Sequence, residues 1–468
     1  MKRVLALLGT VAVVSAIAIP AAQAAPSQRP IAAFSIAAPN GTTPSGLVAR
    51  AVVPAGVSCP VLHMIDTKGH HVNTKMAVRA NPANTGAAFA SLTACTAPLP
   101  AHLTSAKVGT MSIPAAMPTQ VKKMAIFGDT GCRIKGTVIQ NCASPDAWPL
   151  ARISAHITAE HPDLIMFTGD YFYREGECPA DQLALCGATP TPVPGMPFKD
   201  TSESWTADVF TPMADVLAAA PIVLTRGNHE ACNRGGNGYF TYFDPRVNTA
   251  GKCAPTLVDG VLSVPNNELT APYAVDIQVS KDRKLRIVNM DSAYGWDCEV
   301  SSMLPTYQAQ FTEAEALASA KKENWLLIHR PVFGWQPSDD CGPTGGWVVA
   351  DEATASQGKL AKYNMLLSSH IHLAESVNIP GAPGQLVIGN GGTKLEPSPT
   401  VTFPATGPSF TGGGSFQPST SSWADVRHGY AIATPGRANE WAIAMKDKKG
   451  AVFAACHLLS GKITCINR

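Results

Sequence analysis

The chain has 468 residues, and its 36 Lys and Arg residues nearly balance its 34 Asp and Glu residues, which gives a formal net charge of +2. No long run of Lys or Arg occurs, so the charge pattern gives no support for electrostatic binding to nucleic acid or to a membrane surface. The length exceeds that of one typical hydrophobic core and favours two domains.

Residues 1–24 have the pattern of a secretory signal peptide. Lys2 and Arg3 precede an apolar stretch from Val4 to Ile19, and the small residues near Ala24 resemble a cleavage site. The apolar stretch is shorter than the roughly 20 residues that span a bilayer, which favours cleavage after Ala24 over a membrane anchor. We therefore expect an exported protein, periplasmic or extracellular, without a membrane span.

The twelve cysteines fit export, because an even number in an oxidising compartment favours disulfides. Four pairs lie close together in the sequence and are expected to bridge locally. One further bridge is expected in the N-terminal region and one across a longer loop. The six expected bridges are Cys59–Cys95, Cys132–Cys142, Cys178–Cys186, Cys232–Cys253, Cys298–Cys341 and Cys456–Cys465. No CxxC pattern occurs, which gives no support to a redox or zinc-ribbon function.

Residues 25–120 are rich in Ala, Pro, Thr and Val and carry few charges. The stretches 47–53, 59–65 and 75–80 predict strands separated by turns. They favour a small N-terminal domain that resembles a β-sandwich. The proline-rich segment 114–118 would link it to a second domain at residues 121–468.

The second domain alternates short apolar runs with stretches that are compatible with helices. Strands are predicted at residues 122–127, 163–168, 221–225, 285–290, 324–328, 364–368 and 385–389, and helices at 146–160, 204–220 and 312–323. This alternation predicts an α/β layered core with helices outside the sheets. Residues 397–424 lack charged side chains and predict a long surface loop, after which strands return and end in a hairpin at Cys456 and Cys465.

Polar side chains follow five of these strands, in the sequences GDTG, GDYFY, GNHE, HRP and SHIH. They are Asp129, Asp170, Tyr173, Asn228, His229, His329, His370 and His372. Each sequence alone is commonly an ordinary turn, but strand carboxyl ends are where α/β sheets place their binding sites. Such groups, buried without partners, would each cost about a few kcal/mol. Two metal ions are the partners that this set of carboxylates, phenol, amide and imidazoles favours.

The five blocks, in this order, resemble those of the calcineurin-like metallophosphoesterases. The tyrosine of GDYFY resembles the purple acid phosphatases among them, and the resemblance runs from residue 124 to about 395. It implies two layered sheets flanked by helices, after an N-terminal β-sandwich-like domain. The implied protein is a secreted bacterial phosphoric ester hydrolase of the acid phosphatase type, acting on a small-molecule phosphate ester.

The resemblance also assigns roles to individual residues. A first metal ion, Fe(III), would be held by Asp129, Asp170, Tyr173 and His372. A second, divalent ion (Fe, Zn or Mn) would be held by Asn228, His329 and His370 and would share Asp170. His229 would lie beside the phosphate and protonate the departing alkoxide. The implied reaction is phosphomonoester hydrolysis by a metal-activated hydroxide at the dinuclear centre.

Two positions depart from the family pattern. Ser369 stands where a glycine is usual, and Leu326 replaces the usual valine, but neither change removes a ligand. Three alternatives remain open: a phosphodiesterase or nucleotidase on the same scaffold, a secreted glycan- or cell-wall-binding protein with a vestigial metal site, and purely structural metals.

Substrate specificity is expected to lie in the cysteine-bearing insertions after Tyr173, His229 and Asp291. Four further side chains are candidates for contacting phosphate or leaving group, although an ordinary surface or structural role is the simpler interpretation of each. They are Arg133, His156, Arg330 and His428.

Overall fold

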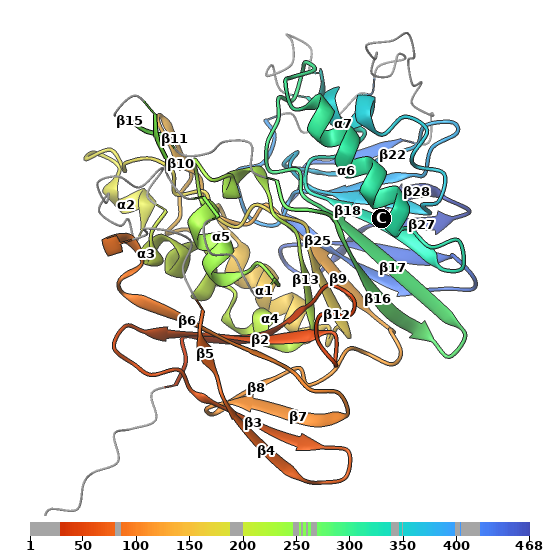
Figure 1. Ribbon diagram of the computed structural model, residues 1–468. Coiled ribbons are helices and arrows are strands. Elements are labelled where there is room, and N and C mark those ends of the chain that lie inside the picture. Colours follow the sequence, from red (N-terminus) through yellow and green to blue (C-terminus); the bar gives the residue numbers. More distant parts are fainter. Residues whose placement is uncertain are drawn as a thin grey trace, which may run out of the picture.

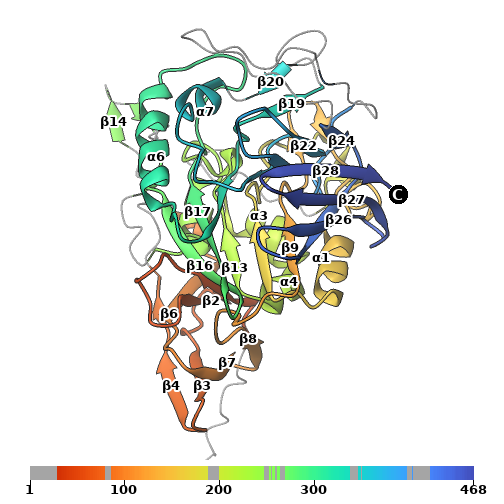
Figure 2. The same cartoon turned by 90° about the vertical axis from the view of Figure 1, so that its right-hand side faces the viewer.

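Two mixed β-sheets pack face to face, and helices cover their outer faces, in the computed structural model (Figures 1 and 2). The structure describes residues 29–79, 86–187, 200–246, 252–253, 256–258, 261–263, 269–337, 346–348, 350–397, 403 and 422–468. The predicted α/β core of two layered sheets flanked by helices is confirmed.

The larger sheet has eleven strands. In spatial order they are β28 (Lys462–Asn467), β27 (Val452–Leu459), β26 (Trp441–Asp447), β25 (Gly429–Pro435), β9 (Met124–Phe127), β12 (Leu164–Phe167), β13 (Ile222–Leu224), β1 (Ala32–Ala37), β2 (Leu47–Pro54), β6 (Leu92–Pro98) and β5 (Ala77–Val78). The strands β9, β12, β13 and β1 run parallel, whereas β25 to β28 form an antiparallel meander beside β9. The predicted return to strands after the loop 397–424, ending in a hairpin at Cys456 and Cys465, is confirmed, with β25 beginning at Gly429.

The second sheet has seven strands, and its central strands run parallel. Their order is β16 (Tyr273–Ser280), β17 (Arg283–Met290), β18 (Glu323–Ile328), β21 (Met365–Ser368), β23 (Gln385–Ile388), β22 (Ala374–Val377) and β24 (Trp423–Asp425). A four-stranded sheet contains β4 (His71–Lys75), β3 (Val61–Asp66), β7 (Leu103–Val108) and β8 (Met111–Ile113). Three two-stranded ribbons pair β10 (Ile134–Lys135) with β11 (Val138–Ile139), β14 (Thr256–Val258) with β15 (Val261–Ser263), and β19 (Gly334–Gln336) with β20 (Gly346–Val348).

The described α-helices match one of the three predicted helices closely. They are α1 (Leu150–Ala159), α2 (Leu183–Cys186), α3 (Ser202–Trp205), α4 (Ala214–Ala219), α5 (Gly236–Tyr242), α6 (Leu304–Leu317) and α7 (Ala350–Ala355). The helix predicted at 146–160 is α1, and the one at 204–220 is divided into α3, a π-helical segment and α4. The bounds 312–323 are wrong, because α6 begins at Leu304, with a proline in its first turn, and Glu323 already belongs to β18.

The central strands are apolar throughout because both of their faces are covered. On β12, Leu164 and Met166 lie in the core between the two sheets, whereas Ile165 and Phe167 lie in the core beneath the helices α1, α4 and α5. The strand β18 alternates in the same way between the inter-sheet core and the core beneath α6. Such two-sided burial explains why the sequence shows short continuous apolar runs rather than alternation.

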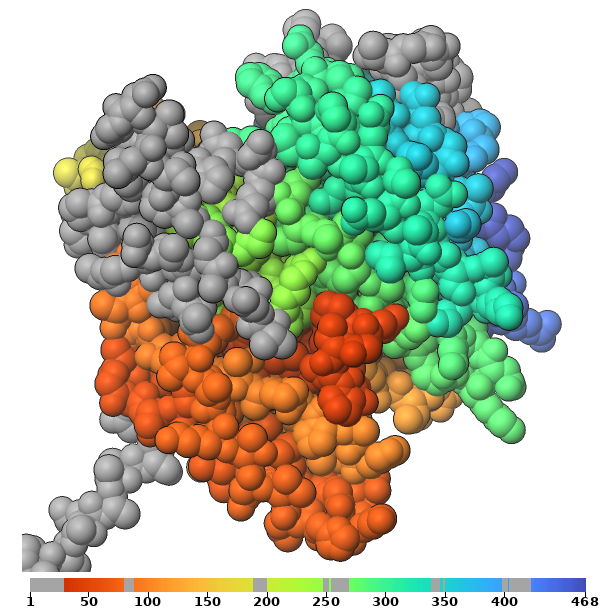
Figure 3. Space-filling model, in the orientation of Figure 1, coloured from red at the N-terminus to blue at the C-terminus, as the bar shows by residue number. Residues whose placement is uncertain are grey.

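The N-terminal region is built into the larger sheet. Strand β1 pairs in parallel with β13, with Ile36 opposite Ile222, and β2, β6 and β5 extend the sheet further. The four-stranded sheet packs against this extension, which gives the predicted sandwich-like arrangement. Figure 3 shows this region, red to orange, directly against the green segments of the core. The larger sheet therefore continues across the domain boundary proposed near residue 120.

Arg50 on β2 joins this region to the end of α5. Its buried guanidinium donates to the carbonyl oxygens of Tyr242 at 2.6 Å and Asp244 at 3.1 Å. Carbonyl groups at a helix C-terminus lack partners within the helix. Arg50→Met should therefore lower the free energy of unfolding by about 1–3 kcal/mol, measured by urea denaturation. Lys107→Met, at an exposed position of β7, should change it by less than about 0.5 kcal/mol. Equal losses in both variants would contradict the capping role of Arg50.

Five of the six expected disulfides are confirmed. They are Cys59–Cys95, Cys132–Cys142, Cys178–Cys186, Cys232–Cys253 and Cys456–Cys465. These bridges indicate an oxidising, extracytoplasmic environment. The partner predicted for Cys298, Cys341, lies outside the described residues, as do the predicted signal peptide and most of the predicted loop 397–424. The end of that loop prediction is wrong, because Trp423 and Ala424 belong to β24, which pairs with β22. In the described part of the chain, no helix has the length and apolar character needed to cross a bilayer.

Candidate active site

Five strand ends, from both large sheets, bring the predicted site residues together. Asp129 follows β9, Asp170 and Tyr173 follow β12, Asn228 and His229 follow β13, His329 follows β18, and His370 and His372 follow β21. Asp129, Asp170 and His370 have positive backbone φ angles, of 54°, 57° and 77°. This conformation is costly for residues other than glycine and is concentrated at functional sites.

Tyr173 is the centre of a first group of donor atoms. Its buried phenol oxygen lies 2.7 Å from Asp129 Oδ1, 2.9 Å from Asp170 Oδ2 and 3.0 Å from His372 Nε2. Burial, together with the two carboxylate charges, raises the pKa of Tyr173 well above its usual range. Burial also raises the pKa of Asp129 to about 8. A cation bound among these oxygens would offset both shifts, because it stabilises the anionic forms.

Asn228 is the centre of a second group. Its side-chain oxygen lies 2.9 Å from His329 Nε2 and 2.8 Å from His370 Nδ1. The other ring nitrogen of His329 lies 2.9 Å from the Thr168 carbonyl oxygen. The other ring nitrogen of His370 lies 2.9 Å from Asp297 Oδ1. These outer acceptors favour a proton on the outer nitrogen of each ring, so that Nε2 of His329 and Nδ1 of His370 carry lone pairs that converge beside Asn228. The same holds for either orientation of the Asn228 amide. Converging imidazole lone pairs are the arrangement that a metal ion requires.

One oxygen atom connects the two groups. Asp170 Oδ2 lies 2.9 Å from the phenol oxygen of Tyr173 and 3.2 Å from His329 Nε2. Neighbouring ligands of an octahedral ion with bonds of about 2.1 Å are about 3 Å apart, which is the spacing within each group. Donor atoms of Asp170, His329 and His370 lie within 4.8 Å of one another. The side chains therefore fit two ions that share Asp170.

Two buried carboxylates that the sequence analysis did not assign hold the turn after β12. Glu230, the last residue of GNHE, accepts hydrogen bonds from the backbone N–H groups of Asp170 at 3.1 Å and Tyr171 at 2.8 Å. Asp208 accepts one from the Tyr173 N–H group at 3.0 Å. Glu230 could have been found from the sequence, because it belongs to the motif GNHE, which already contained two site candidates. Asp208 lies within a predicted helix and gave none.

His229 is held with one ring nitrogen turned toward the candidate ligands. Its Nδ1 lies 2.7 Å from Glu175 Oε1, and its Nε2 lies 3.8 Å from Asp170 Oδ2. Arg234 Nε donates to the same oxygen of Glu175 at 2.6 Å. Burial lowers the pKa of His229 to about 4, and the Arg234 charge acts in the same direction, whereas Glu175 opposes the shift. The ring also packs on Tyr173, with ring centroids 3.8 Å apart.

Asp297, in the loop after β17, supports the other side of the site. It contacts His370 and forms an ion pair with Arg330, which also donates to the Gly295 carbonyl oxygen at 3.0 Å. Burial would raise the pKa of Asp297, but the charges of Arg330 and His370 hold it well below its usual range. A carboxylate behind a ligating imidazole orients that ligand. The sequence marked this loop only as a specificity insertion and did not identify Asp297.

A cleft of about 580 Å³ opens onto this cluster. Its wall includes five cationic side chains, Arg133, Lys135, Arg234, Arg330 and Lys394. Two of the four further candidates for substrate contact, Arg133 and Arg330, are thus in the cleft wall. The other two are not part of it, since His156 lies on α1 and His428 directly precedes β25.

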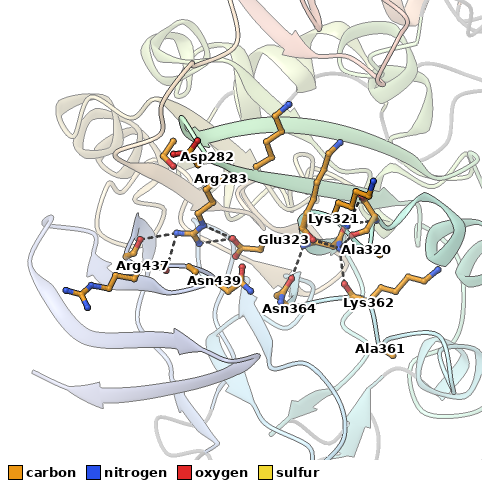
Figure 4. Close-up of a pocket in the computed structure, with 17 residues that line it drawn as sticks. Asp282, Arg283, Ala320, Lys321, Glu323, Ala361, Lys362, Asn364, Arg437 and Asn439 are labelled. Atoms are coloured by element: carbon orange, nitrogen blue, oxygen red, sulfur yellow. Dashed lines mark hydrogen bonds and ion pairs between the residues drawn. The ribbon is translucent and has the colours of Figure 1, made fainter.

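A larger cavity, of about 870 Å³, lies at the opposite ends of the strands of the second sheet, where β18 begins at Glu323. Figure 4 shows Arg283 in its wall directed toward Glu323, with 2.7 Å between Nη2 and Oε2. Among the described residues, this cavity contains no group of three or more side chains that could ligate one metal ion. The chemistry is therefore expected in the cleft of 580 Å³.

Ser369, which replaces the usual glycine, is accommodated without displacing a ligand. Its buried hydroxyl group donates to the Thr168 carbonyl oxygen at 2.7 Å and lies 3.0 Å from His329 Nδ1. The hydroxyl group and the imidazole therefore contact the same carbonyl group, and Ser369 supports the orientation of His329.

Comparison with known proteins places this geometry in a family. Residues 122–374, which include all five strand-end blocks, match the family model for calcineurin-like phosphoesterases, and the chain belongs to that family. It is thus a member of the metallophosphoesterases, whose members bind metal ions and act on phosphate esters. No match was found among curated proteins.

Two solved structures have a similar fold. Purple acid phosphatase PPD1 from yellow lupin (Lupinus luteus) seeds has a TM-score of 0.52 and 13% sequence identity, over 90% of this chain and 72% of that chain. PhoD has a TM-score of 0.52 and 11% identity, over 93% of this chain and 92% of that chain. At these identities the likeness concerns the fold alone, and it agrees with the two-sheet architecture.

Proposed function

We propose that this protein hydrolyses phosphate monoesters as a dinuclear acid phosphatase. The ferric ion would be held by Asp129, Asp170, Tyr173 and His372, and the divalent ion by Asp170, Asn228, His329 and His370. The observation that carries the proposal is the position of Asp170 Oδ2, which lies within 3.2 Å of donor atoms in both groups. A structural metal site has no need for such a shared ligand at the floor of an open cleft.

The side chains of the protein position the metal ions and provide a proton for the leaving group. When bound, the two ions polarise the phosphoryl oxygens and lower the pKa of a water molecule. In the hydrolysis, a water oxygen would form a bond to phosphorus while the bond between phosphorus and the alcohol oxygen breaks. In its protonated form, His229 would give a proton from Nε2 to the departing oxygen, and because burial lowers its pKa to about 4 this form is populated at acidic pH. Glu175 holds the opposite side of the ring at 2.7 Å, and Arg234 Nη2 lies 2.7 Å from Nε2 itself.

Metal analysis combined with a substrate panel tests the proposal. The purified protein should contain about two ions per chain, and it should hydrolyse p-nitrophenyl phosphate faster than bis(p-nitrophenyl) phosphate. A preference for the diester would favour the phosphodiesterase alternative. A protein with both ions that hydrolyses neither compound would overturn the proposed activity.

Tyr173 is proposed to ligate Fe(III) as a phenolate. A phenolate is a hard, electron-rich donor, and its charge transfer to ferric iron absorbs visible light, so the purified protein should be violet to pink. Tyr173→Phe should lose this absorption. Tyr171→Phe is the matched control, because its phenol is also buried but donates to the Thr225 carbonyl oxygen at 3.0 Å instead.

Visible spectra and iron content of the three proteins decide this assignment. Colour in the wild type and in Tyr171→Phe, with none in Tyr173→Phe, is the expected result. A colourless, active wild type that contains only divalent metals would overturn the ferric assignment while leaving a two-metal hydrolase in place.

Export with cleavage after Ala24 is proposed as well, and the disulfides support it. The mass and N-terminal sequence of the protein recovered outside the cytoplasm test this proposal. A mature chain that begins at Ala25 is expected, and retention of residues 1–24 would contradict it.

A further inference from the structure

A disulfide-bridged hairpin forms one wall of the candidate active-site cleft. The ribbon β10–β11 lies between Cys132 and Cys142, which are bonded to each other. Arg133, Lys135 and Val138, all from this short segment, line the cleft. The hairpin follows directly after the turn that presents Asp129, so it stands beside the ligands rather than at a distance.

The base of the hairpin is held in place by Gln140. Its buried side-chain oxygen accepts a hydrogen bond from the Arg133 N–H group at 3.0 Å. Its side-chain nitrogen donates to the carbonyl oxygens of Gly392 at 2.8 Å and Ala147 at 2.7 Å. Gly392 lies two residues before Lys394, which lines the same cleft. Gln140 thus ties the backbone of Arg133 to the segment that carries Lys394.

The cations of the cleft differ in how they are paired. Arg234 is bound to Glu175, and Arg330 is bound to Asp297. Lys135 lies 3.7 Å from Glu175 Oε2. In the described part of the chain, the ion pairs of the cleft cations involve Lys135, Arg234 and Arg330, and none of them involves Arg133 or Lys394. The cleft therefore has two cations whose charge is available to a ligand.

Arg133 faces the cleft and is not one of the side chains that hold the candidate metal ligands in place. Its guanidinium carbon lies 5.9 Å from the centroid of the Tyr173 ring, on the cleft side of that ring. Among the described residues, the apolar ones in the cleft wall are Val138, Leu395 and Pro397. A wall with so few apolar groups offers little to a hydrophobic leaving group, whereas a guanidinium fork matches the geometry of phosphate and carboxylate.

We propose that the hairpin and Lys394 bind a second anionic group, a phosphate or a carboxylate, on the leaving group of the substrate. Arg133 is the specificity-determining residue of this subsite. The inference rests on the proposed phosphatase function and specifies its substrate class: small phosphate esters or anhydrides whose departing part is itself anionic. During hydrolysis that part leaves with the second anion intact, and only the bond to the scissile phosphorus breaks.

Kinetics with matched substrates tests this subsite. Phenyl phosphate has a leaving group without a second charge, 3-phosphoglycerate carries a carboxylate, and fructose 1,6-bisphosphate carries a second phosphate. For each compound, kcat/KM is measured for the wild type and for Arg133→Gln, so that the ratio cancels intrinsic reactivity. The ratio of the wild-type kcat/KM to the Arg133→Gln kcat/KM should be about 10- to 100-fold larger for at least one anionic substrate than for phenyl phosphate. The substrate with the larger ratio identifies the anion as phosphate or carboxylate.

Two further variants make the result specific. Arg133→Lys keeps the charge and should recover part of the lost selectivity. Lys321→Gln removes an exposed charge in the distant cavity of Figure 4 and should leave all three values unchanged. Raising the ionic strength should lower kcat/KM of the wild type more steeply for the anionic substrates.

The outcomes distinguish failure of this inference from failure of the proposed function. Equal losses for all three substrates in Arg133→Gln, with metal content and melting temperature unchanged, would place Arg133 at the scissile phosphate and overturn the second subsite. A wild type that hydrolyses none of the substrates with both ions bound would overturn the phosphatase function itself.

Discussion

Asp170→Asn is expected to abolish both hydrolysis and stable metal binding. Asp170 Oδ2 is the oxygen that contacts donors of both groups, and its other oxygen accepts a hydrogen bond from the His229 N–H group at 2.8 Å. An amide removes the negative charge that two cations would share. Since the ions are proposed to supply most of the charge stabilisation, kcat/KM should fall by roughly 10³-fold or more.

Metal content and activity of the variant are measured on the same preparation. Asp282→Asn is the matched control, because Asp282 is exposed in the distant cavity and the same charge is removed there. That control should keep about two ions per chain and wild-type turnover. If Asp170→Asn retained both ions and normal turnover, the two donor groups would not form one dinuclear centre.

The sequence predicted those parts of the fold that depend on local patterns. The central strands were identified because both faces are buried, as for Leu164 to Phe167, and five strand-end motifs revealed the candidate ligands. The start of α6 was missed, because the face that it buries combines Tyr307 and Phe311 with the polar Gln310 and is not a clear apolar stripe. The parallel pairing of β1 with β13 joins segments far apart in the sequence, and no local pattern reports such a pairing.

The supporting residues of the site were not predictable for the same reason. Asp208 contacts the turn of Tyr173 across 35 residues of sequence, and Asp297 contacts His370 across 73. An isolated acidic residue in a helix or a loop is most simply a solvated surface group. Only the fold shows that these carboxylates are directed inward, where each orients a candidate ligand or its turn.

His229→Ala is expected to slow hydrolysis by roughly 10²–10⁴-fold while leaving the metal content unchanged. Asn228, its neighbour, is the proposed metal ligand, and His229 is proposed to act on the leaving group instead. Its ring is fixed by Glu175 on Nδ1 and by packing on Tyr173, and Arg234 Nη2 lies 2.7 Å from Nε2. A residue that only filled space would affect all substrates alike, whereas a proton donor affects those that need a proton.

The dependence on the leaving group therefore decides the role of His229. The leaving group of an alkyl phosphate is a strongly basic alkoxide, which requires protonation. The leaving group of a nitrophenyl phosphate is a stable phenolate, which does not. The loss in His229→Ala should be large for the first class and small for the second. His156→Ala, on α1 and outside the cleft wall, should lose neither activity. An equal loss for both classes would contradict the proton-donor role of His229 and would indicate that it binds the phosphate group. Another group, such as water, would then have to protonate the alkoxide.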